Sequence, residues 1–456
     1  FVDGIDDIKK AVVSYTPEWA AAHTGMSSEK ITQLAHDFSS ADRAICYGRM
    51  GVSTQRFGTL CQWAIQIINI LTHSLDVRGG MLLPSPAFGY IKPGESGAGH
   101  FAAFHSRVSG LPEFAGELPS TVMAEEILTE GEGQIRALIT TAGNPVLSAP
   151  NGQQMDAALS ALDFMVCIDF YINETTQHAD IILPPTSALE HDHYDIAFHR
   201  LAVHNTARFN EAVFEPAAGT MHDWEIFNGL GQAIAAHKGI EIKPLPSPDK
   251  LVDMGIQRGP YSATAGHRLE LTLDKIKQHP HGLDIGPLAP SLPERLCTSD
   301  GKITLVADYI ITDLKRLGAD KATTETDELL LIGRRHIRSN NSWMHNSHRL
   351  VKGKPRWQLL MHPEDLAARN LQHESQVRIQ SRVGSVETQV LASDEVMPGV
   401  VSLPHGWGHK RAGVSMAIAG EQDGVSCNDL TDDKLIDQIS GNAALNGVPV
   451  KIYGVQ

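Results

Sequence analysis

Closely spaced cysteines are the first feature that this sequence lacks. Its five cysteines, Cys46, Cys61, Cys167, Cys297 and Cys427, are scattered, and no two of them form a CxxC pair. An odd, scattered set argues against a disulfide framework and is typical of thiols in a reducing compartment. The spacing also excludes an iron–sulfur cluster held by this chain alone in the usual clustered way.

Long apolar runs are lacking as well. The most apolar helix candidate, residues 64–71, is interrupted by Gln66 and Asn69 and is far shorter than a bilayer span. Residues 1–15 have neither a basic leader nor an apolar core. We therefore expect no membrane span and a cytoplasmic protein, although the chain opens on Phe1 and a leader upstream of it is not excluded.

The length of 456 residues exceeds what one core supports, so roughly two to four domains are expected. Changes in composition and the positions of Gly- and Pro-rich stretches divide the chain into four predicted segments. They are an α/β domain at 1–119, a dinucleotide-binding-like α/β domain at 120–237, a connecting region at 238–326 and a β-barrel at 327–456. The connecting region is rich in proline, which predicts little core of its own.

Helical spacing of apolar residues predicts helices at 27–38 and 60–71. A short apolar run at 43–47, followed by glycines, reads as a strand before the second helix, which together make a unit of a parallel sheet. Residues 80–119 are rich in Gly, Pro and Ser and are predicted to form a long loop.

The clearest α/β pattern lies between residues 135 and 183. Strands are predicted at 135–140, 164–168 and 180–183, and a helix at 155–162. Ligands of such sheets bind beyond the carboxyl ends of the strands, which Gly143, Asn144 and Asp169 mark here. An Asp in this position binds a ligand or caps a helix, and the sequence leaves both roles open for Asp169.

Acidic residues are absent between positions 329 and 363, although the whole chain has a formal net charge of -15. The stretch holds seven of the 38 Lys and Arg residues, namely Arg334, Arg335, Arg338, Arg349, Lys352, Lys354 and Arg356. A basic run without acids to pair it makes a local positive field in an acidic molecule. Asn, Ser and Trp between the charges supply the donors and the flat ring that hold a phosphate-bearing heterocycle.

This basic stretch follows a predicted strand, 328–332, that ends at Gly333. Arginines at a strand end favour an anion site, whereas a solvated basic loop is the plainer interpretation. Nucleic acid is disfavoured as the anion, because a chain with a pI near 5.8 lacks the broad basic face that it requires. A metal site at the histidine-rich residues 190–200 is also disfavoured, because His191, His193 and His199 match no zinc-ligand spacing.

After the basic stretch, a short helix is predicted at 362–369. Strands follow at 376–380, 385–391, 399–403 and 448–452. Runs of alternating apolar residues that are separated by glycines are typical of β-hairpins and barrels.

Five segments follow one another in a characteristic order. They are MGVSTQRFG with the helix leading to DVRGG; AGNPVLSAPN with DFMVCIDFYINETTQHADIILPPTSALEHD; LLLIGRRHIRSNNSWMHN; MHPEDLAARNLQHESQVRI; and VSCNDLTD with VPVKI. Each segment alone is a weak signal. Together, in this order, they resemble the molybdopterin-dependent oxidoreductases of the DMSO reductase and formate dehydrogenase type.

The resemblance implies a bis-molybdopterin guanine dinucleotide cofactor holding molybdenum or tungsten, between α/β domains and a C-terminal β-barrel of the double-psi type. It implies cofactor contacts at the strand ends by Gly143, Asn144, Asp169, Glu174 and Thr175, and at the barrel by Gly333, Arg334, Arg338, Ser339, Asn340, Asn428 and Lys451. The implied activity is two-electron chemistry on a small-molecule substrate, with electrons passed through a 4Fe-4S centre to a redox partner protein.

Two departures limit what the resemblance carries over. The family's N-terminal cysteine motif and the residue that ligates the metal have no counterpart here, so we expect this chain to be the C-terminal portion of a catalytic subunit and name no catalytic residue. Formate dehydrogenases have an Arg-Gly-Gln-Asn-Asn type run after the position of Gly80, and MLLPSPAFGYIKPGESGAGHF replaces it, with Arg107 downstream in another context. Formate therefore remains one candidate substrate.

A different class of function also fits the resemblance. The molybdopterin fold persists without metal as a scaffold in the large cluster-carrying subunit of respiratory complex I. Retention of the basic stretch favours cofactor binding, because an abandoned site has no use for unpaired arginines.

Overall fold

The computed structural model describes residues 1–89, 100–320 and 327–455 and divides the chain into two compact units. The first unit combines Phe1–Tyr47, Ile65–Gly99 and Leu183–Ala307, and the second combines Gly48–Ala64, His100–Ile182 and Asp308–Gln456. These units do not follow the four contiguous segments expected from the sequence, because each gathers three separate pieces of chain.

The first unit is made of short elements around a small core. They are β1 (Val2–Asp3), α1 (Ile5–Val12), α2 (Pro17–Thr24), α3 (Ser28–Ser40), β7 (His193–Tyr194), β8 (Asn205–Ala207), β9 (Phe209–Asn210), α9 (Asp223–His237), α10 (Pro248–Gln257), α11 (Leu273–Lys277), β10 (Leu283–Gly286) and β11 (Ile303–Thr304). Its strands form three two-stranded pairs, β1 with β11, β8 with β10, and β7 with β9.

The region 238–326 contributes more core than its proline content predicts, so the expectation of a connector with little core is wrong. Ile256, Leu271 and Ile276 are almost fully buried and share a cluster with Ala207 and Phe209. Burying a side chain of that size contributes about 1.5–3 kcal/mol, so this region helps to hold the first unit together.

The strand predicted at 43–47 does not form. The buried side chain of Asn69, on α5 (Gly58–Leu71), takes the place of a neighbouring strand: its Oδ1 accepts from the Cys46 N–H at 2.8 Å, and its Nδ2 donates to the Cys46 carbonyl at 2.9 Å. Because a buried amide satisfies this backbone, no ladder is needed. The predicted helices are confirmed as α3, capped by Ser27, and α5, although Leu34 of α3 is 60% exposed.

The α/β part of the second unit is a three-stranded parallel sheet in the order β4 (Ala137–Thr141), β5 (Phe164–Ile168), β6 (Ile181–Ile182). Helices α6 (Met123–Leu128), α7 (Pro145–Ser148) and α8 (Gly152–Ser160) accompany it. Met155, Leu159 and Met165 are among the side chains of its core. The parallel sheet predicted for this region is confirmed.

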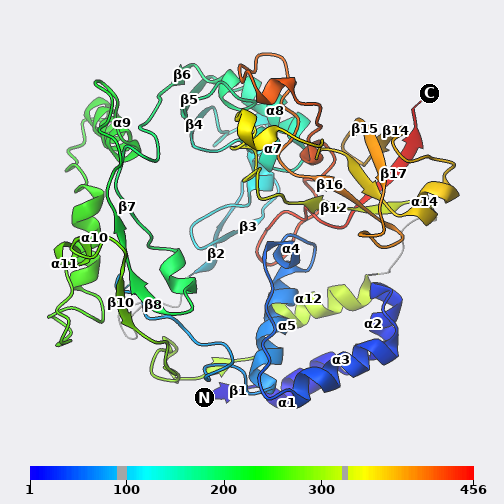
Figure 1. The fold of residues 1–456 in the computed structure, drawn as a ribbon, viewed down its shortest axis with the longest axis horizontal. Coiled ribbons are helices and arrows are strands. Elements are labelled where there is room, and N and C mark those ends of the chain that lie inside the picture. The colour runs from blue at the N-terminus through cyan, green and yellow to red at the C-terminus, as the bar shows by residue number, and fades with distance from the viewer. Residues whose placement is uncertain (90–99, 321–326, 456) are drawn as a thin grey trace. The chain divides into compact units, whose positions relative to one another are not determined.

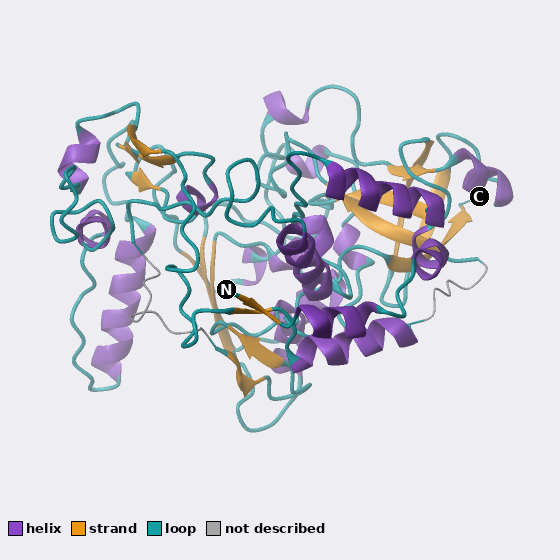
Figure 2. Ribbon diagram, turned by 90° about the horizontal axis from the view of Figure 1, so that it is seen from below, coloured by secondary structure: helices purple, strands orange, loops and turns teal. Residues whose placement is uncertain are grey.

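The C-terminal part of the second unit is a closed six-stranded barrel in the order β12-β16-β13-β15-β14-β17 (Figures 1 and 2). The strands are β12 (Leu329–Arg334), β13 (Leu359–Met361), β14 (Gln376–Gln380), β15 (Ser385–Ala392), β16 (Val400–Pro404) and β17 (Val448–Gly454). Two pairs, β12 with β16 and β13 with β15, are parallel, and the others are antiparallel. The predicted fold class, α/β with a C-terminal barrel, is confirmed.

Alternation of apolar residues explains how the barrel closes on a core. In β14, Val377 and Ile379 are fully buried while their neighbours are exposed, and Leu331, Leu359 and Met361 are also fully buried. The remaining elements of the second unit are α4 (Met50–Ser53), β2 (Phe101–His105), β3 (Pro112–Phe114), α12 (Asp308–Ala319), α13 (His348–Val351), α14 (Pro363–Ala368) and the first turns of α5. None of the described helices is both long enough and apolar enough to cross a bilayer.

Candidate functional site

The basic stretch emerges from the barrel as β12 ends at Arg334. The loop that follows folds on itself through backbone bonds, among them Ser339 N to His336 O at 3.0 Å and Met344 N to Ser339 O at 3.2 Å. Within the described residues, no carboxylate lies within 4.0 Å of any of its seven Lys and Arg side chains. Among the residues that the structure describes, the positive field predicted from the sequence therefore has no ion pair to neutralise it.

Several of these charges lie close enough to act on one another. Burial lowers the pKa of His336, and the charges of Arg356, Arg338 and Arg334 lower it further. Burial and the charge of Arg338 likewise lower the pKa of Arg356, whose Nε is a buried donor without a partner among the described residues. Gathering like charges and leaving a donor unpaired both cost free energy, and a bound anion would offset both.

Beside this cluster lies a cavity of about 400 Å³, lined by Arg335, His336, Ile337, Asn340 and Met344. Asn340 is one of the predicted cofactor contacts, and its backbone adopts a positive φ of 40°. Arg338, another predicted contact, is exposed and makes no side-chain hydrogen bond within the described part of the chain. These side chains keep donors available for a ligand.

Arg334 has a different role in the structure. Its Nη1 donates to the Ser402 carbonyl at 2.9 Å and its Nη2 donates to the Gln358 carbonyl at 2.8 Å, both on or beside neighbouring barrel strands. Its pKa is lowered, chiefly by burial. The neighbouring Gly333 donates its N–H to Asn446 Oδ1 at 2.9 Å. Arg334 and Gly333 thus fasten the end of β12. The exposed arginines lie in the loop that follows this strand.

A chain of buried polar side chains runs from this loop to the strand-end turn of the α/β sheet. Ser339 Oγ lies 2.9 Å from His345 Nε2, His345 Nδ1 lies 2.9 Å from His409 Nε2, and His409 Nδ1 lies 2.9 Å from Glu174 Oε1. Each of these four side chains is 6% exposed or less. Two predicted site residues, Ser339 and Glu174, are therefore joined through two histidines.

The strand-end turn continues the same network. Asn144 Nδ2 donates to the second oxygen of Glu174 at 2.7 Å, and Thr175 Oγ1 donates to Asn144 Oδ1 at 2.8 Å. Burial raises the pKa of Glu174, but hydrogen bonds from His409 and Asn144 outweigh it and hold the pKa below its ordinary value. Three predicted residues, Asn144, Glu174 and Thr175, thus meet around one ionised carboxylate. Gly143 precedes them at the end of β4.

A glycine turn after β16 brings His409 into place. Gly406 and Gly408 have φ values of 88° and 113°, and a Cβ on Gly406 would lie 2.2 Å from the Asn341 carbonyl oxygen. Only glycine permits this approach of two backbones. Trp407 between them stacks on the ring of His345, with centroids 3.9 Å apart and planes 21° apart.

Asp169 is occupied locally. Its Oδ1 accepts from the N–H groups of Phe170 and Tyr171 at 2.7 and 3.2 Å, and its Oδ2 accepts from Asn173 Nδ2 at 3.1 Å. The sequence left open whether Asp169 binds a ligand or caps a helix. These contacts are local, so in the structure the side chain orders the turn that follows it. Its contact with a cofactor stays a prediction.

Asn428 and Lys451 lie apart from the cavity beside Arg335. Asn428 Nδ2 donates to the Leu147 carbonyl at 2.6 Å, and its Oδ1 accepts from Thr431 at 2.8 Å, so it ties the barrel to α7. Lys451 lines a second cavity, of about 530 Å³, with Arg382 and Asp432. The structure thus does not bring all the predicted barrel residues to one cavity.

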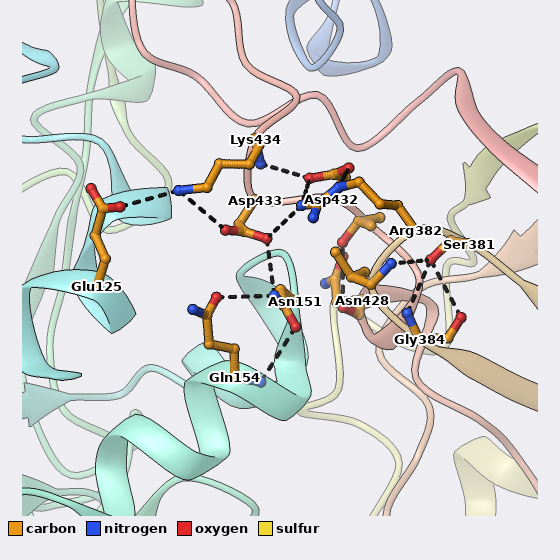
Figure 3. Close-up of polar contacts among 12 residues, drawn as sticks. Glu125, Asn151, Gln154, Ser381, Arg382, Gly384, Asn428, Asp432, Asp433 and Lys434 are labelled. Atoms are coloured by element: carbon orange, nitrogen blue, oxygen red, sulfur yellow. Dashed lines mark hydrogen bonds and ion pairs between the residues drawn. The ribbon is translucent and has the colours of Figure 1, made fainter. Parts of the chain in front are cut away.

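Figure 3 shows the polar contacts near Asn428 that fasten the loop between β16 and β17 to α8. Arg382 pairs with Asp432 and Asp433, and Lys434 bridges Asp433 and Glu125. Asn151, the N-cap of α8, donates to Asp433 Oδ1 at 2.9 Å. These contacts fix the barrel relative to the α/β sheet within the second unit.

His345, His409 and Trp407 were not among the predicted site residues. Sequence signals for them exist: His345 belongs to the acid-free stretch, and PHGWGH places two glycines, a tryptophan and two histidines after a strand. Their pairing is not visible, because His345 and His409 are 64 positions apart and His409 and Glu174 are 235 apart.

Arg107 and the histidine-rich loop add little to the site. Arg107 Nε donates to Glu126 at 3.1 Å and its Nη2 donates to the Thr129 carbonyl at 2.7 Å. Residues 90–99, inside the segment that replaces the formate dehydrogenase run, lie outside the described residues. In the described chain, no group of three His, Cys, Asp or Glu side chains is arranged to hold a metal ion.

Comparison with known proteins identifies the family. A model described as molybdopterin oxidoreductase matches residues 13–233, and a model described as molydopterin dinucleotide binding domain matches residues 329–449. The chain belongs to the molybdopterin oxidoreductases. The second match covers the barrel and the basic stretch, so this molybdopterin oxidoreductase chain contains a molybdopterin dinucleotide-binding domain.

Curated relatives among the molybdopterin oxidoreductases differ in name. Over 88% of this chain, it is 26% identical to the probable oxidoreductase YjgC of Bacillus subtilis, covering 40% of that protein. It is 23% identical over 88% of its length to the F420-dependent formate dehydrogenase 1 subunit alpha of Methanococcus maripaludis, covering 59% of it. It is also 23% identical over 86% of its length to the trimethylamine-N-oxide reductase of Haemophilus influenzae, covering 52% of it. The chain spans about half the length of these relatives.

Among solved structures, acetylene hydratase from Pelobacter acetylenicus matches all of this chain with a TM-score of 0.75 and 17% identity, over 67% of that protein. At this identity the match shows the shared molybdopterin oxidoreductase fold and does not bear on substrate.

Proposed function

We propose that this chain binds a bis-molybdopterin guanine dinucleotide carrying molybdenum or tungsten, as part of an oxidoreductase that acts on a small substrate. The observation that carries the proposal is the pair of mutually repelling guanidinium groups of Arg338 and Arg356 beside His336, with no carboxylate within 4.0 Å of either among the described residues. A ligand that supplies negative charge would relieve this repulsion, and a dinucleotide brings a diphosphate.

The available donors match that ligand. Arginine forks suit phosphate oxygens, and the amide of Asn340 suits the edge of a heterocycle. The cavity of about 400 Å³ beside Arg335 is within the usual range for part of a small-molecule ligand, and the unpaired Nε of Arg356 is a buried donor in need of an acceptor. On these grounds the residues fit a phosphorylated pterin.

The residues of this chain have two kinds of role: some bind the ligand, and others hold the loops and turns in place. Arg335, Arg338 and Asn340 bind the ligand, while Arg334 and Gly333 hold the end of β12 from which the loop departs. Asn144, Glu174 and Thr175 order the strand-end turn, and Asp169 orders the turn beside it. When bound, the cofactor supplies the metal centre that exchanges two electrons with the substrate.

Formate and oxygen-bearing small molecules are the substrate classes that we propose. The names of the formate dehydrogenase and trimethylamine-N-oxide reductase relatives support this choice. We further propose that the electrons pass through a 4Fe-4S centre, outside this chain, to a redox partner. Because the chain spans about half of these relatives, activity belongs to the whole protein, and the shared fold with a hydratase does not select among chemistries.

The test is a charge reversal at Arg338, beside the residues that line the cavity, with a matched control. Arg338→Glu is expected to lower the pterin and metal content of the purified full-length protein at least tenfold, because it replaces a phosphate donor by a repelling charge. Arg349→Glu makes the same charge change in the same stretch, on the exposed face of α13, and should retain the cofactor. Pterin fluorescence after release and elemental analysis measure the result, and normal content in Arg338→Glu would refute the proposed placement.

The scaffold alternative has one observation in its favour. Several residues predicted to contact the cofactor use their side-chain donors for hydrogen bonds within the chain, among them Asn144, Asn428 and Arg334. A scaffold needs such contacts and no ligand. Absence of both pterin and metal from the native full-length protein would favour the scaffold.

A further inference from the structure

A cavity in the first unit is not accounted for by the proposed function. It has a volume of about 370 Å³, and its lining residues come from positions 83–89, 200, 258–265 and 295. All of these positions belong to the first compact unit, whereas the loop that carries Arg338 belongs to the second. The cavity is therefore a candidate binding site built within one unit.

The charged residues of the cavity wall are all cationic. They are Arg200, Arg258 and Arg295, and none of the described lining residues is an Asp or a Glu. In the described part of the chain, neither Arg258 nor Arg295 has a carboxylate oxygen within 4.0 Å. Two guanidinium groups that face one cavity without an acid, in a chain of net charge -15, favour an anion as the ligand.

The two arginines differ in how they are held. Arg295 Nη1 donates to the carbonyls of Leu83 and Pro84 at 3.2 and 3.0 Å, which fixes this side chain against the cavity wall. Its Nε and Nη2 make no hydrogen bond with the described residues. The Arg258 side chain is exposed and forms neither a hydrogen bond nor an ion pair within the described ranges. Both arginines therefore keep donors for a ligand.

The wall of the cavity is preformed. A Cβ on Gly259 would lie 2.0 Å from the Ala87 carbonyl oxygen, so glycine is what lets these two segments approach. The backbone of Ser85 is fixed on both sides: its N–H donates to Asn205 Oδ1 at 2.8 Å, and its carbonyl accepts from the Tyr261 hydroxyl at 2.9 Å. Because these contacts are already made, little has to be ordered when a ligand binds.

Apolar side chains make up most of the remaining wall, and they decide the class of anion. They are Leu83, Pro84, Pro86, Pro260 and Ala265. A phosphate or sulfate ion presents oxygen on every side and gains nothing from such a surface. A carboxylate attached to a few carbons pairs its two oxygens with a guanidinium fork and buries its carbons. The volume of the cavity is at the lower end of the range for small-molecule sites.

We propose that this cavity binds a small organic carboxylate, whose oxygens Arg258 and Arg295 hold and whose carbons pack on the Leu, Pro and Ala side chains. The site is additional to the proposed cofactor site, because it requires neither a pterin nor a metal.

Binding is measured on the full-length protein by NMR titration with acetate, butyrate and benzoate. Inorganic phosphate and the neutral amide butyramide are the comparison probes. Butyrate is expected to bind about tenfold more tightly than butyramide, because the amide lacks the charge, and more tightly than phosphate, because phosphate lacks the carbons. No binding of any of the three carboxylates, or phosphate binding as tight as butyrate binding, would overturn the proposal.

Variants assign the bound anion to this cavity. Arg258→Gln removes a charge whose side chain has no contact to lose, so the protein should fold and bind butyrate about tenfold more weakly. Arg208→Gln makes the same change at an exposed position of the same unit that does not line the cavity, and it should bind butyrate as the parent does. Unchanged affinity in Arg258→Gln, or an equal loss in Arg208→Gln, would overturn the assignment.

Two further results separate this site from the proposed function. Ala265→Phe fills the cavity from an exposed position without changing its charge, and it should weaken butyrate binding while the pterin content stays normal. A protein without pterin that still binds butyrate would refute the proposed function and leave this site standing. Butyrate binding that Arg338→Glu removes and Arg258→Gln leaves intact would place the anion at the barrel and overturn the inference.

Discussion

A neutral imidazole in a buried position is stable only while it stays neutral. His345 is 1% exposed and faces His409, Arg356 and His405, and all three lower its pKa after burial itself, to about 3. His405 is in a similar position, since burial and then the charge of Arg335 lower its pKa to about 4. Two histidines beside a cationic loop thus add no further positive charge to it at neutral pH.

These depressed pKa values predict a dependence of stability on pH. The unfolded chain binds a proton at His345 below its ordinary pKa of 6.5 while the folded protein does not, so the free energy of unfolding falls as pH drops from 6.5 toward 3. Between pH 7.5 and 5.0 this histidine alone accounts for about 2 kcal/mol. Urea unfolding at the two pH values should show a smaller loss in His345→Gln than in the parent protein.

His348→Gln provides the comparison for that experiment. This exposed histidine should leave the pH dependence as it is in the parent protein. Equal losses for His345→Gln, His348→Gln and the parent would contradict the burial of a neutral His345.

Among the elements, α8 depends on an unusual start. Its N-cap Asn151 has φ 54° and ψ 58°, in the left-handed region, and its Oδ1 accepts from Gln154 N at 3.4 Å. Its Nδ2 donates to Asp433 Oδ1, so one side chain starts the helix and joins it to the loop between β16 and β17 (Figure 3). Asparagine suits this position because it tolerates the left-handed conformation and caps at once.

Two substitutions separate these contributions. Asn151→Ala loses the cap and the bond to Asp433 and forces alanine into the left-handed region, for a total cost of about 2–3 kcal/mol. Asn151→Gly loses the same hydrogen bonds, but glycine adopts the left-handed backbone conformation without strain. It should therefore destabilise the fold by about 1 kcal/mol less than Asn151→Ala. Denaturant unfolding of the second unit's signal compares them, and equal destabilisation would show that the left-handed backbone is not costly here.

The whole molecule combines a net charge of -15 with a basic loop whose Lys and Arg side chains have no carboxylate within 4.0 Å among the described residues. Anions that occupy the loop should therefore stabilise the folded protein by mass action. For the cofactor-free protein, pyrophosphate at about a hundred times its dissociation constant is expected to raise the melting temperature by about 2 °C or more. A thermal-shift series measures this.

Controls for the pyrophosphate experiment are an added salt and a variant. Sodium chloride at equal ionic strength screens the repulsion without binding and should have a smaller effect. Arg338→Glu should abolish most of the pyrophosphate effect and Arg349→Glu should not. A shift that is equal in both variants would mean that the anion binds outside the proposed cavity.

Local sequence patterns were sufficient to predict those strands and helices whose formation depends on residues close in the sequence. Five of the six barrel strands, α14 and the three parallel strands of the second unit lie within a few residues of their predicted positions, because alternation and turn residues act over short distances. The sixth barrel strand, β13, was not predicted. The strand predicted at 43–47 failed because the buried Asn69 amide, 23 positions away, satisfied its backbone.

By itself, the sequence determined that an acidic chain carries an acid-free basic stretch at the end of a strand, and that an α/β sheet and a barrel flank it. Charge and periodicity are properties of composition and spacing, so folding does not alter them. Only the tertiary structure decided which of those cations are used internally, as Arg334 is, and which remain available, as Arg338 does. It also decided that His345 and His409 meet Glu174, because burial and hydrogen bonding join side chains that the sequence leaves far apart.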